Sequence, residues 1–232
     1  MRKSSFVTAA LLLLAALGVS SVQASPEEDA IRAALKAQFN WTVEKIEPAP
    51  VKGLWQVWVQ RRLFYVDADA AHLIAGPIMD ARTRQDLSEA KESEWRWESF
   101  PRRDALKQVW GKGEREVVVF SDANCTYCAQ MDKLFEKVGN LTVYTFVTPM
   151  LRGKVNNSEV ICSADPAKTW HAWMTARASL PDVPKGCDDS VLDRNLSLAG
   201  DLGINSAPTM YFKSGAMVRG AIPEDVLERH LR

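Results

Sequence analysis

The stretch Phe120-Ser121-Asp122-Ala123-Asn124-Cys125-Thr126-Tyr127-Cys128 decides how this chain folds. Residues 117–120 read Val-Val-Val-Phe, a short continuous apolar run that is typical of a strand buried on both faces. Over residues 128–138 the apolar side chains recur at helical spacing. The pattern therefore predicts a buried strand, a short loop and a helix, with two cysteines at the start of the helix.

The two cysteines have the spacing of a redox-active pair. Cys125 lies at the mouth of the predicted helix, where free backbone N–H groups and the helix dipole favour a negative charge. Its thiol should lose a proton more readily than a free cysteine, whose pKa is about 8.5. Cys128 follows one helical turn later on the same face, so it can attack a mixed disulfide held on Cys125 and release the bound molecule.

Cys162 and Cys187 are the other two cysteines, and four cysteines allow three pairings. The spacing favours 125–128 and 162–187. A zinc site made of all four is one alternative, but Cys162 and Cys187 do not form a second C-x-x-C. A purely structural disulfide at 125–128 is another alternative, which the flanking strand and helix disfavour. We expect no metal and no cofactor.

Ala207-Pro208-Thr209-Met210 is a second feature of interest, far along the chain from the cysteine pair. Pro208 opens a predicted strand, where a missing N–H is tolerated. Most X-Pro bonds are trans, and a trans turn proline is the common explanation of such a segment. The position of Pro208 relative to the cysteine pair nevertheless favours a cis-proline.

Residues 1–24 have the three parts of a secretory signal: a positive start, an apolar run over residues 6–19, and small residues at the end. The apolar run is shorter than the roughly 20 residues that a membrane-spanning helix needs, which disfavours an uncleaved anchor. We expect cleavage after Ala24 and export to an oxidising compartment, where disulfides persist.

Residues 25–80 predict a small α+β unit, with a helix over 27–39 followed by short alternating strands. Residues 81–112 predict a largely helical linker, because polar residues fall on nearly every face of its first part, as in helices that bridge domains in solvent. Trp95 and Trp97 lie in this polar stretch, and we expect them to be partly buried.

Residues 113–232 predict a second domain with the order strand, helix, strand, further helices, two strands and a final helix. This order indicates a mixed sheet covered by helices. The whole chain has 29 basic and 29 acidic residues, so its net charge gives no indication of a nucleic-acid partner or an acidic membrane surface.

These segments resemble the thioredoxin superfamily and, more narrowly, the DsbC/DsbG family of periplasmic disulfide isomerases. The resemblance covers nearly the whole mature chain. It is carried by residues 120–128, 202–209 and 214–215 and, in the N-terminal unit, by 46–51 and 76–80. It implies an α+β and α/β protein with a small cystatin-like N-terminal dimerisation domain, a helical linker, and a C-terminal thioredoxin fold with a helical insertion.

The resemblance also implies roles for individual residues. Cys125 and Cys128 would be catalytic, and Pro208 would be the cis-proline packed beside them. The backbone next to it would accept an extended substrate chain as an added strand. We expect substrate contacts from Pro208, Ala207, Thr126 and Tyr127. The family's structural disulfide falls on Cys162 and Cys187.

The function implied by the resemblance is thiol:disulfide interchange in the periplasm, where the protein would isomerise or reduce wrong disulfides. Its partners would be misfolded or oxidised secreted proteins, a membrane thiol reductase as electron donor, and a second copy of the chain in a V-shaped homodimer. We expect no nucleic-acid partner.

Three departures from the family pattern leave the redox role open. Thr126 stands where the best-known members have Gly or Pro, and Ala207 stands where these isomerases usually carry Thr. Val119 takes the place of the buried Asp of thioredoxin itself. The alternatives are a specialised reductase for sulfenic acids or a narrow set of clients, a disulfide-donating oxidase, and an added role as a holdase chaperone.

Overall fold

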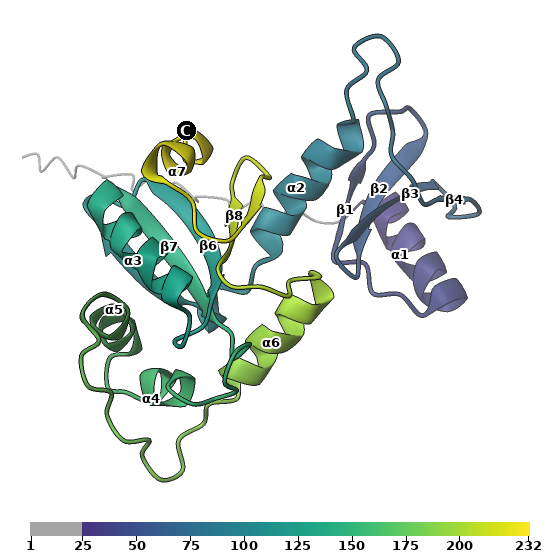
Figure 1. Ribbon diagram of the computed structural model, residues 1–232. Coiled ribbons are helices and arrows are strands. Elements are labelled where there is room, and N and C mark those ends of the chain that lie inside the picture. The colour runs from purple at the N-terminus through teal and green to yellow at the C-terminus, as the bar shows by residue number, and fades with distance from the viewer. Residues whose placement is uncertain (1–24) are drawn as a thin grey trace, which may run out of the picture.

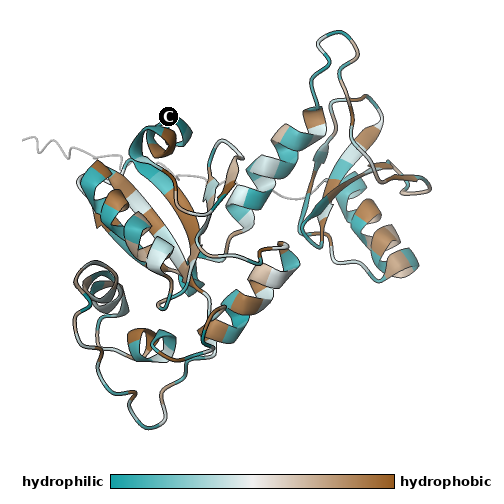
Figure 2. Ribbon diagram, in the orientation of Figure 1, coloured by the Kyte–Doolittle hydropathy of each residue, from teal (hydrophilic) through white to brown (hydrophobic). Residues whose placement is uncertain are grey.

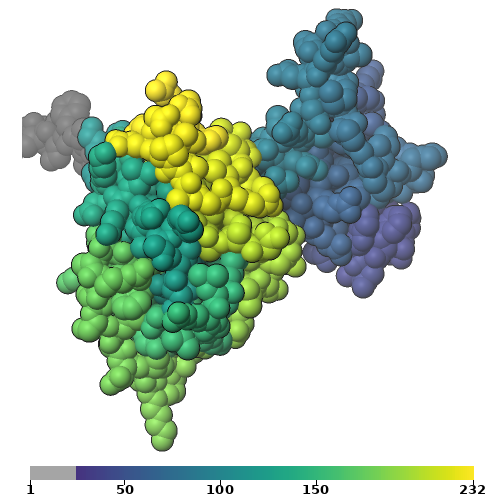
Figure 3. Space-filling view, viewed as in Figure 1, coloured from purple at the N-terminus to yellow at the C-terminus, as the bar shows by residue number. Residues whose placement is uncertain are grey.

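The computed structural model describes residues 25–232, so the predicted secretory signal lies outside the described part. The chain forms an N-terminal lobe and a larger C-terminal lobe, which touch each other (Figure 3). No helix within residues 25–232 combines the length and the apolar character needed to cross a membrane.

The N-terminal lobe is a four-stranded antiparallel sheet with a helix on one face (Figure 1). The elements are α1 (Pro26–Phe39), β1 (Lys45–Pro48), β2 (Leu54–Val59), β3 (Arg62–Asp67) and β4 (Leu73–Ile74), and the strand order is β1-β2-β3-β4. The Ser25 hydroxyl caps α1 by accepting the Glu28 N–H at 3.2 Å. Ile31 and Leu35 of α1 are fully buried against the sheet, which confirms the predicted α+β unit.

Helix α2 (Leu87–Ser99) covers the other face of this sheet. Successive residues of β2 point to opposite faces, so Val57 packs with α1 whereas Trp58 packs edge-on against Trp95, with ring centroids 5.9 Å apart. The Ser88 hydroxyl and the Tyr65 hydroxyl, one from the helix and one from β3, are 2.6 Å apart and hydrogen-bonded. Through Ser88 and Trp95, helix α2 therefore belongs to the core of the N-terminal lobe.

Trp97 lies on another side of α2 and packs into the C-terminal lobe. Two residues along a helix turn about 200°, so neighbouring tryptophans can serve opposite cores. Trp97 joins a buried cluster with Phe100, Phe120 and Tyr211. The expectation of a helix bridging the lobes through solvent, with partly buried tryptophans, was wrong: Trp95 is fully buried and Trp97 nearly so. In Figure 2, α2 is largely hydrophilic or neutral in hydropathy. Its average polarity therefore does not reveal that its two indoles lie in hydrophobic cores.

The C-terminal lobe is built on a five-stranded mixed sheet of order β5-β7-β6-β8-β9. Its strands are β5 (Leu106–Trp110), β6 (Arg115–Ser121), β7 (Leu141–Val147), β8 (Thr209–Phe212) and β9 (Met217–Arg219). Only β6 and β7 pair in parallel, and every other pair is antiparallel. The mixed sheet was predicted, but β5 was not: the sequence placed it in the helical linker, whereas the structure pairs Leu106 with Thr145 and Trp110 with Leu141.

Helices cover both faces of this sheet (Figure 1). They are α3 (Thr126–Val138), α4 (Asn157–Ile161), α5 (Pro166–Ala176), α6 (Val191–Asp201) and α7 (Glu224–His230), with a single 3-10 turn, η1 (Arg102–Asp104), before β5. Helices α3 and α7 share one cluster with Val117 and Val119, while α6 and the end of α2 share another with Val118 and Phe120. The strand before the cysteine pair is thus buried on both faces, as predicted.

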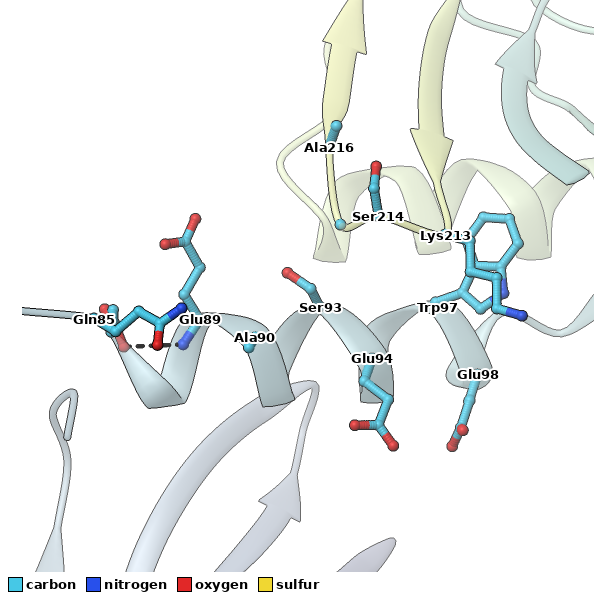
Figure 4. A pocket seen from close by; sticks show the side chains of 12 residues that line it. Gln85, Glu89, Ala90, Ser93, Glu94, Trp97, Glu98, Lys213, Ser214 and Ala216 are labelled. Atoms are coloured by element: carbon cyan, nitrogen blue, oxygen red, sulfur yellow. Dashed lines mark hydrogen bonds between the residues drawn. The ribbon is translucent and has the colours of Figure 1, made fainter. Parts of the chain in front are cut away.

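The β8–β9 turn meets α2 at the boundary between the lobes. Gly215 has φ +89°, and a Cβ there would lie 2.5 Å from the Ser93 side chain, so only glycine fits this approach. A pocket of about 640 Å³ lies between the helix and the turn. Figure 4 shows Ser93 pointing toward the turn, whereas Glu94 and Glu98 point away from it.

Candidate active site

The loop after β6 delivers Cys125 to the first turn of α3. Cys125 has extended backbone angles and is the N-cap of the helix. Its sulfur accepts the Cys128 backbone N–H at 3.1 Å, taking up one of the free donors at the helix start. The sequence-predicted pair is therefore brought together, with both residues buried and both thiols free.

The surroundings shift the pKa values of the two thiols in opposite directions. A hydrogen bond from the Cys128 side chain, aided by the backbone N–H groups of Cys128 and Tyr127, lowers the pKa of Cys125 to about 7, although burial acts in the opposite sense. Burial raises the pKa of Cys128 far above its ordinary value, and the neighbouring Cys125 sulfur raises it further. Near neutral pH the pair thus offers one thiolate, on Cys125, beside one thiol.

The lowered pKa predicts how the reactivity of Cys125 depends on pH. The thiolate is the reactive form, so iodoacetamide alkylation of the reduced protein should be half-maximal near pH 7 and should fall about tenfold for each pH unit well below that. A Cys128→Ala variant removes the thiol that donates to Cys125, so its midpoint should move to higher pH. An unshifted midpoint near pH 9 in the wild-type protein would contradict this assignment.

The predicted proline segment lies against the cysteine pair. The Ala207–Pro208 peptide bond is cis, and Pro208 is buried immediately before β8. The Cys125 sulfur is 3.4 Å from the Ala207 carbonyl oxygen, to which its thiol can donate. Thr126 and Tyr127 are exposed beside the pair. The structure therefore gathers Ala207, Pro208, Thr126 and Tyr127 around Cys125.

The helical insertion after β7 completes the wall behind the cysteines. Val160 of α4 and Trp170 and Met174 of α5 are buried in one cluster with Cys125 and Cys128. Apolar walls of this kind keep water from the Cys128 sulfur, which is consistent with its raised pKa.

Cys162 and Cys187 form a disulfide that ties the end of α4 to the segment before α6. With these two sulfurs bonded to each other, the alternative of a four-cysteine zinc site is wrong. Within residues 25–232, His, Cys, Asp and Glu side chains do not form any group of three that could hold a metal ion.

Asp122 is a site residue that sequence reasoning missed. It is fully buried, and its carboxylate accepts the backbone N–H groups of Asn124 and Leu151 at 2.8 Å each and the Asn157 side-chain amide at 3.2 Å. Its charge lies close enough to raise the pKa of Cys125, against the lowering hydrogen bonds. Asp122 two residues before Asn124 is a local turn pattern; nothing in the sequence links it to Leu151 or Asn157.

Comparison with known proteins finds likeness along both lobes. The family model described as "Disulfide bond isomerase protein N-terminal domain" matches residues 22–89, and the one described as "Thioredoxin-like domain" matches residues 102–232. The "Probable thiol:disulfide interchange protein DsbC" of Bordetella pertussis is 36% identical over 212 residues, which cover 89% of this chain and 75% of that protein. The "Thiol:disulfide interchange protein DsbC" of Escherichia coli K12 is 23% identical over 230 residues, covering 95% of this chain and 94% of that one.

Among solved structures, the disulfide interchange protein from Neisseria gonorrhoeae is similar with a TM-score of 0.52 and 30% sequence identity. The match covers 57% of this chain and 99% of that one. The likeness in sequence and in structure therefore points to the same class of redox protein.

Proposed function

This chain belongs to the DsbC family of thiol:disulfide interchange proteins, and from that membership we propose that Cys125 is its attacking cysteine and Cys128 its resolving cysteine. The observation that carries the assignment is the opposite shift of the two pKa values, lowered at Cys125 and raised at Cys128. The protein is an enzyme of thiol–disulfide exchange, and the proposal concerns which atoms perform it.

The reaction begins when the Cys125 thiolate attacks one sulfur of a client disulfide. A new S–S bond joins Cys125 to the client, and the other client sulfur leaves as a thiolate that takes up a proton. In isomerisation, a client thiolate then attacks elsewhere and eventually releases Cys125, with no net gain or loss of electrons. In reduction, Cys128 loses its proton and attacks the Cys125 sulfur, which frees the client thiol and leaves the pair oxidised.

Contacts around Cys125 support a place for the client chain. The carbonyl oxygen of Ala207 is 3.4 Å from the Cys125 sulfur, and Pro208 follows Ala207 immediately before β8. Backbone groups here can pair with an extended client segment. Thr126 and Tyr127, both exposed, complete the proposed client contacts.

The proposed setting is the periplasm, with a homodimer formed through the N-terminal lobe and a membrane thiol reductase as electron donor. The N-terminal lobe supports this because it is a separate packed unit that matches the N-terminal domain of disulfide isomerases. The proposed clients are misfolded or oxidised secreted proteins.

Trapping of thiols in freshly quenched cells tests the direction of exchange. A pair kept mostly reduced supports isomerase or reductase chemistry, because only the free Cys125 thiolate can attack a client disulfide. A pair found mostly oxidised contradicts the proposal and indicates a disulfide donor. A Cys162→Ser, Cys187→Ser variant is a useful control, since its only remaining thiols are those of the pair.

A further inference from the structure

Asp132 is a buried carboxylate that takes no part in the bond-making steps of thiol–disulfide exchange. It lies on α3 one helical turn after Cys128, so the two side chains are on the same face of the helix. Only 3% of Asp132 is exposed. Burying a carboxylate is costly unless it accepts hydrogen bonds, so the partners of Asp132 indicate what it does.

Helix α5 of the helical insertion supplies a partner for each oxygen of Asp132. The Trp170 indole N–H donates to Oδ1 at 3.0 Å, and Nδ1 of His171 is hydrogen-bonded to Oδ2 at 2.8 Å. Nε2 of His171 is also 3.5 Å from a carboxylate oxygen of Glu136, one turn further along α3. Asp132 is therefore the residue through which α5 is attached to α3.

Trp170 extends this contact to the cysteine pair. It is 1% exposed and packs in the cluster that contains Cys125 and Cys128. One turn further along α5, the Trp173 indole N–H donates to the carbonyl of Ala123 at 2.7 Å, two residues before Cys125. The inward face of α5 thus forms part of the buried wall around Cys128, and burial raises the pKa of the Cys128 thiol.

The protonation state of Cys128 decides how a client leaves Cys125. In reduction, the Cys128 thiol gives its proton to water and the thiolate attacks the Cys125 sulfur. The bond between Cys125 and the client then breaks, and the client sulfur leaves as a thiolate that takes up a proton. In isomerisation, a thiolate of the client attacks first. A Cys128 that stays protonated slows reduction and leaves the bound client more time to rearrange.

We propose that Asp132 is a positioning residue that holds the Trp170 indole in the wall around Cys128, keeps release by Cys128 slow, and so favours isomerisation of a bound client over its reduction. The inference rests on the proposed function, in which Cys125 attacks and Cys128 releases. Without its acceptor the indole N–H would be buried and unpaired, which favours movement of the ring toward water and entry of water toward Cys128. Attack by Cys125 should not change.

The test measures attack and release separately in the reduced full-length protein near neutral pH. The protein is mixed with an excess of a peptide disulfide, quenched with acid at successive times, and separated by mass into free thiol, mixed disulfide and oxidised pair. Asp132→Ala should form the mixed disulfide at the wild-type rate and convert it to the oxidised pair at least about threefold faster. If the pKa of Cys128 falls by one, its thiolate population rises about tenfold and its nucleophilicity falls about threefold, which leaves a gain of about threefold.

Asp132→Asn is the matched conservative variant. Its amide oxygen can accept the Trp170 indole N–H, and its NH₂ group can donate to Nδ1 of His171 when that ring is neutral. It should therefore keep the wild-type rate of release. Trp170→Phe keeps an aromatic ring but lacks the N–H, so it should release clients faster, and it provides the test if Asp132→Ala does not fold.

Asp165→Ala is the control for a general loosening of α5. The exposed Asp165 side chain caps this helix by accepting the Lys168 N–H at 3.1 Å. This variant should keep both wild-type rates. An unchanged release rate in folded Asp132→Ala, an equal increase in Asp132→Asn or Asp165→Ala, or a matching change in the rate of attack would each overturn the proposal. A wild-type protein that forms no mixed disulfide at Cys125 would instead overturn the proposed function on which it rests.

Discussion

Replacing Cys125 with serine is expected to abolish isomerisation of scrambled ribonuclease, with a loss of about a thousandfold or more. A serine hydroxyl is not ionised near neutral pH, and it cannot form the S–S bond on which exchange depends. The hydrogen bonds from the Cys128 side chain and from the backbone N–H groups of Cys128 and Tyr127, which lower the pKa of the Cys125 thiol to about 7, cannot make an alcohol ionise near neutral pH. The measurement is recovery of ribonuclease activity against time in a glutathione buffer.

Cys128→Ser is the matched variant for this experiment, because it changes the same atom type one helical turn away. It should still attack disulfides, and it should accumulate mixed disulfides with clients because no internal thiol can release them. If Cys125→Ser kept isomerase activity while Cys128→Ser lost all reactivity toward disulfides, the two roles would have to be exchanged.

Replacing Trp95 with alanine is expected to destabilise the N-terminal lobe by about 3–5 kcal/mol, the range found for removal of a fully buried large aromatic side chain. The indole packs edge-on against Trp58, and the ammonium groups of Lys45 and Lys91 lie over it at 5.9 and 5.5 Å. Its loss opens a cavity between α2 and the sheet. Urea unfolding followed by circular dichroism measures the change.

Two further variants sharpen this prediction. Glu89→Ala changes an exposed residue of the same helix and should alter the unfolding free energy by no more than about 0.5 kcal/mol. Trp97→Ala removes an indole from the C-terminal cluster, so its main effect should fall on the transition of that lobe. If Trp95→Ala were as mild as Glu89→Ala, α2 would not be part of the N-terminal core.

Much of this fold could be predicted because several segments carry a hydrophobic pattern that is visible in their own sequence. The buried strand before Cys125 has a continuous apolar run, and α3 has helical spacing, so both are visible without tertiary information. The cysteine pair and the Ala207-Pro208 segment needed more: neither pattern alone specifies that they meet, and the resemblance to a family supplied their contact.

The helix of α2 was predicted, but its burial was not, and strand β5 was missed altogether, because both depend on contacts with distant parts of the chain. Helix α2 is polar by count, and its place between two cores depends on Trp95 and Trp97 being on opposite sides. Strand β5 lies at the sheet edge and has no apolar alternation in the sequence, because its buried Gln108 is polar and its exposed Val109 is apolar. The Asp122 network escaped for the same reason, since its partners Leu151 and Asn157 are close only after folding.

The central claim is that Cys125, and not Cys128, forms the bond to the client. It is tested most directly by mixing the reduced protein with a peptide disulfide, quenching with acid during the first turnover, and locating the peptide by tandem mass spectrometry of the digested protein. The account predicts that the peptide is attached to the Cys125 sulfur, with Cys128 still a free thiol. Attachment to Cys128, with Cys125 unmodified, would contradict it.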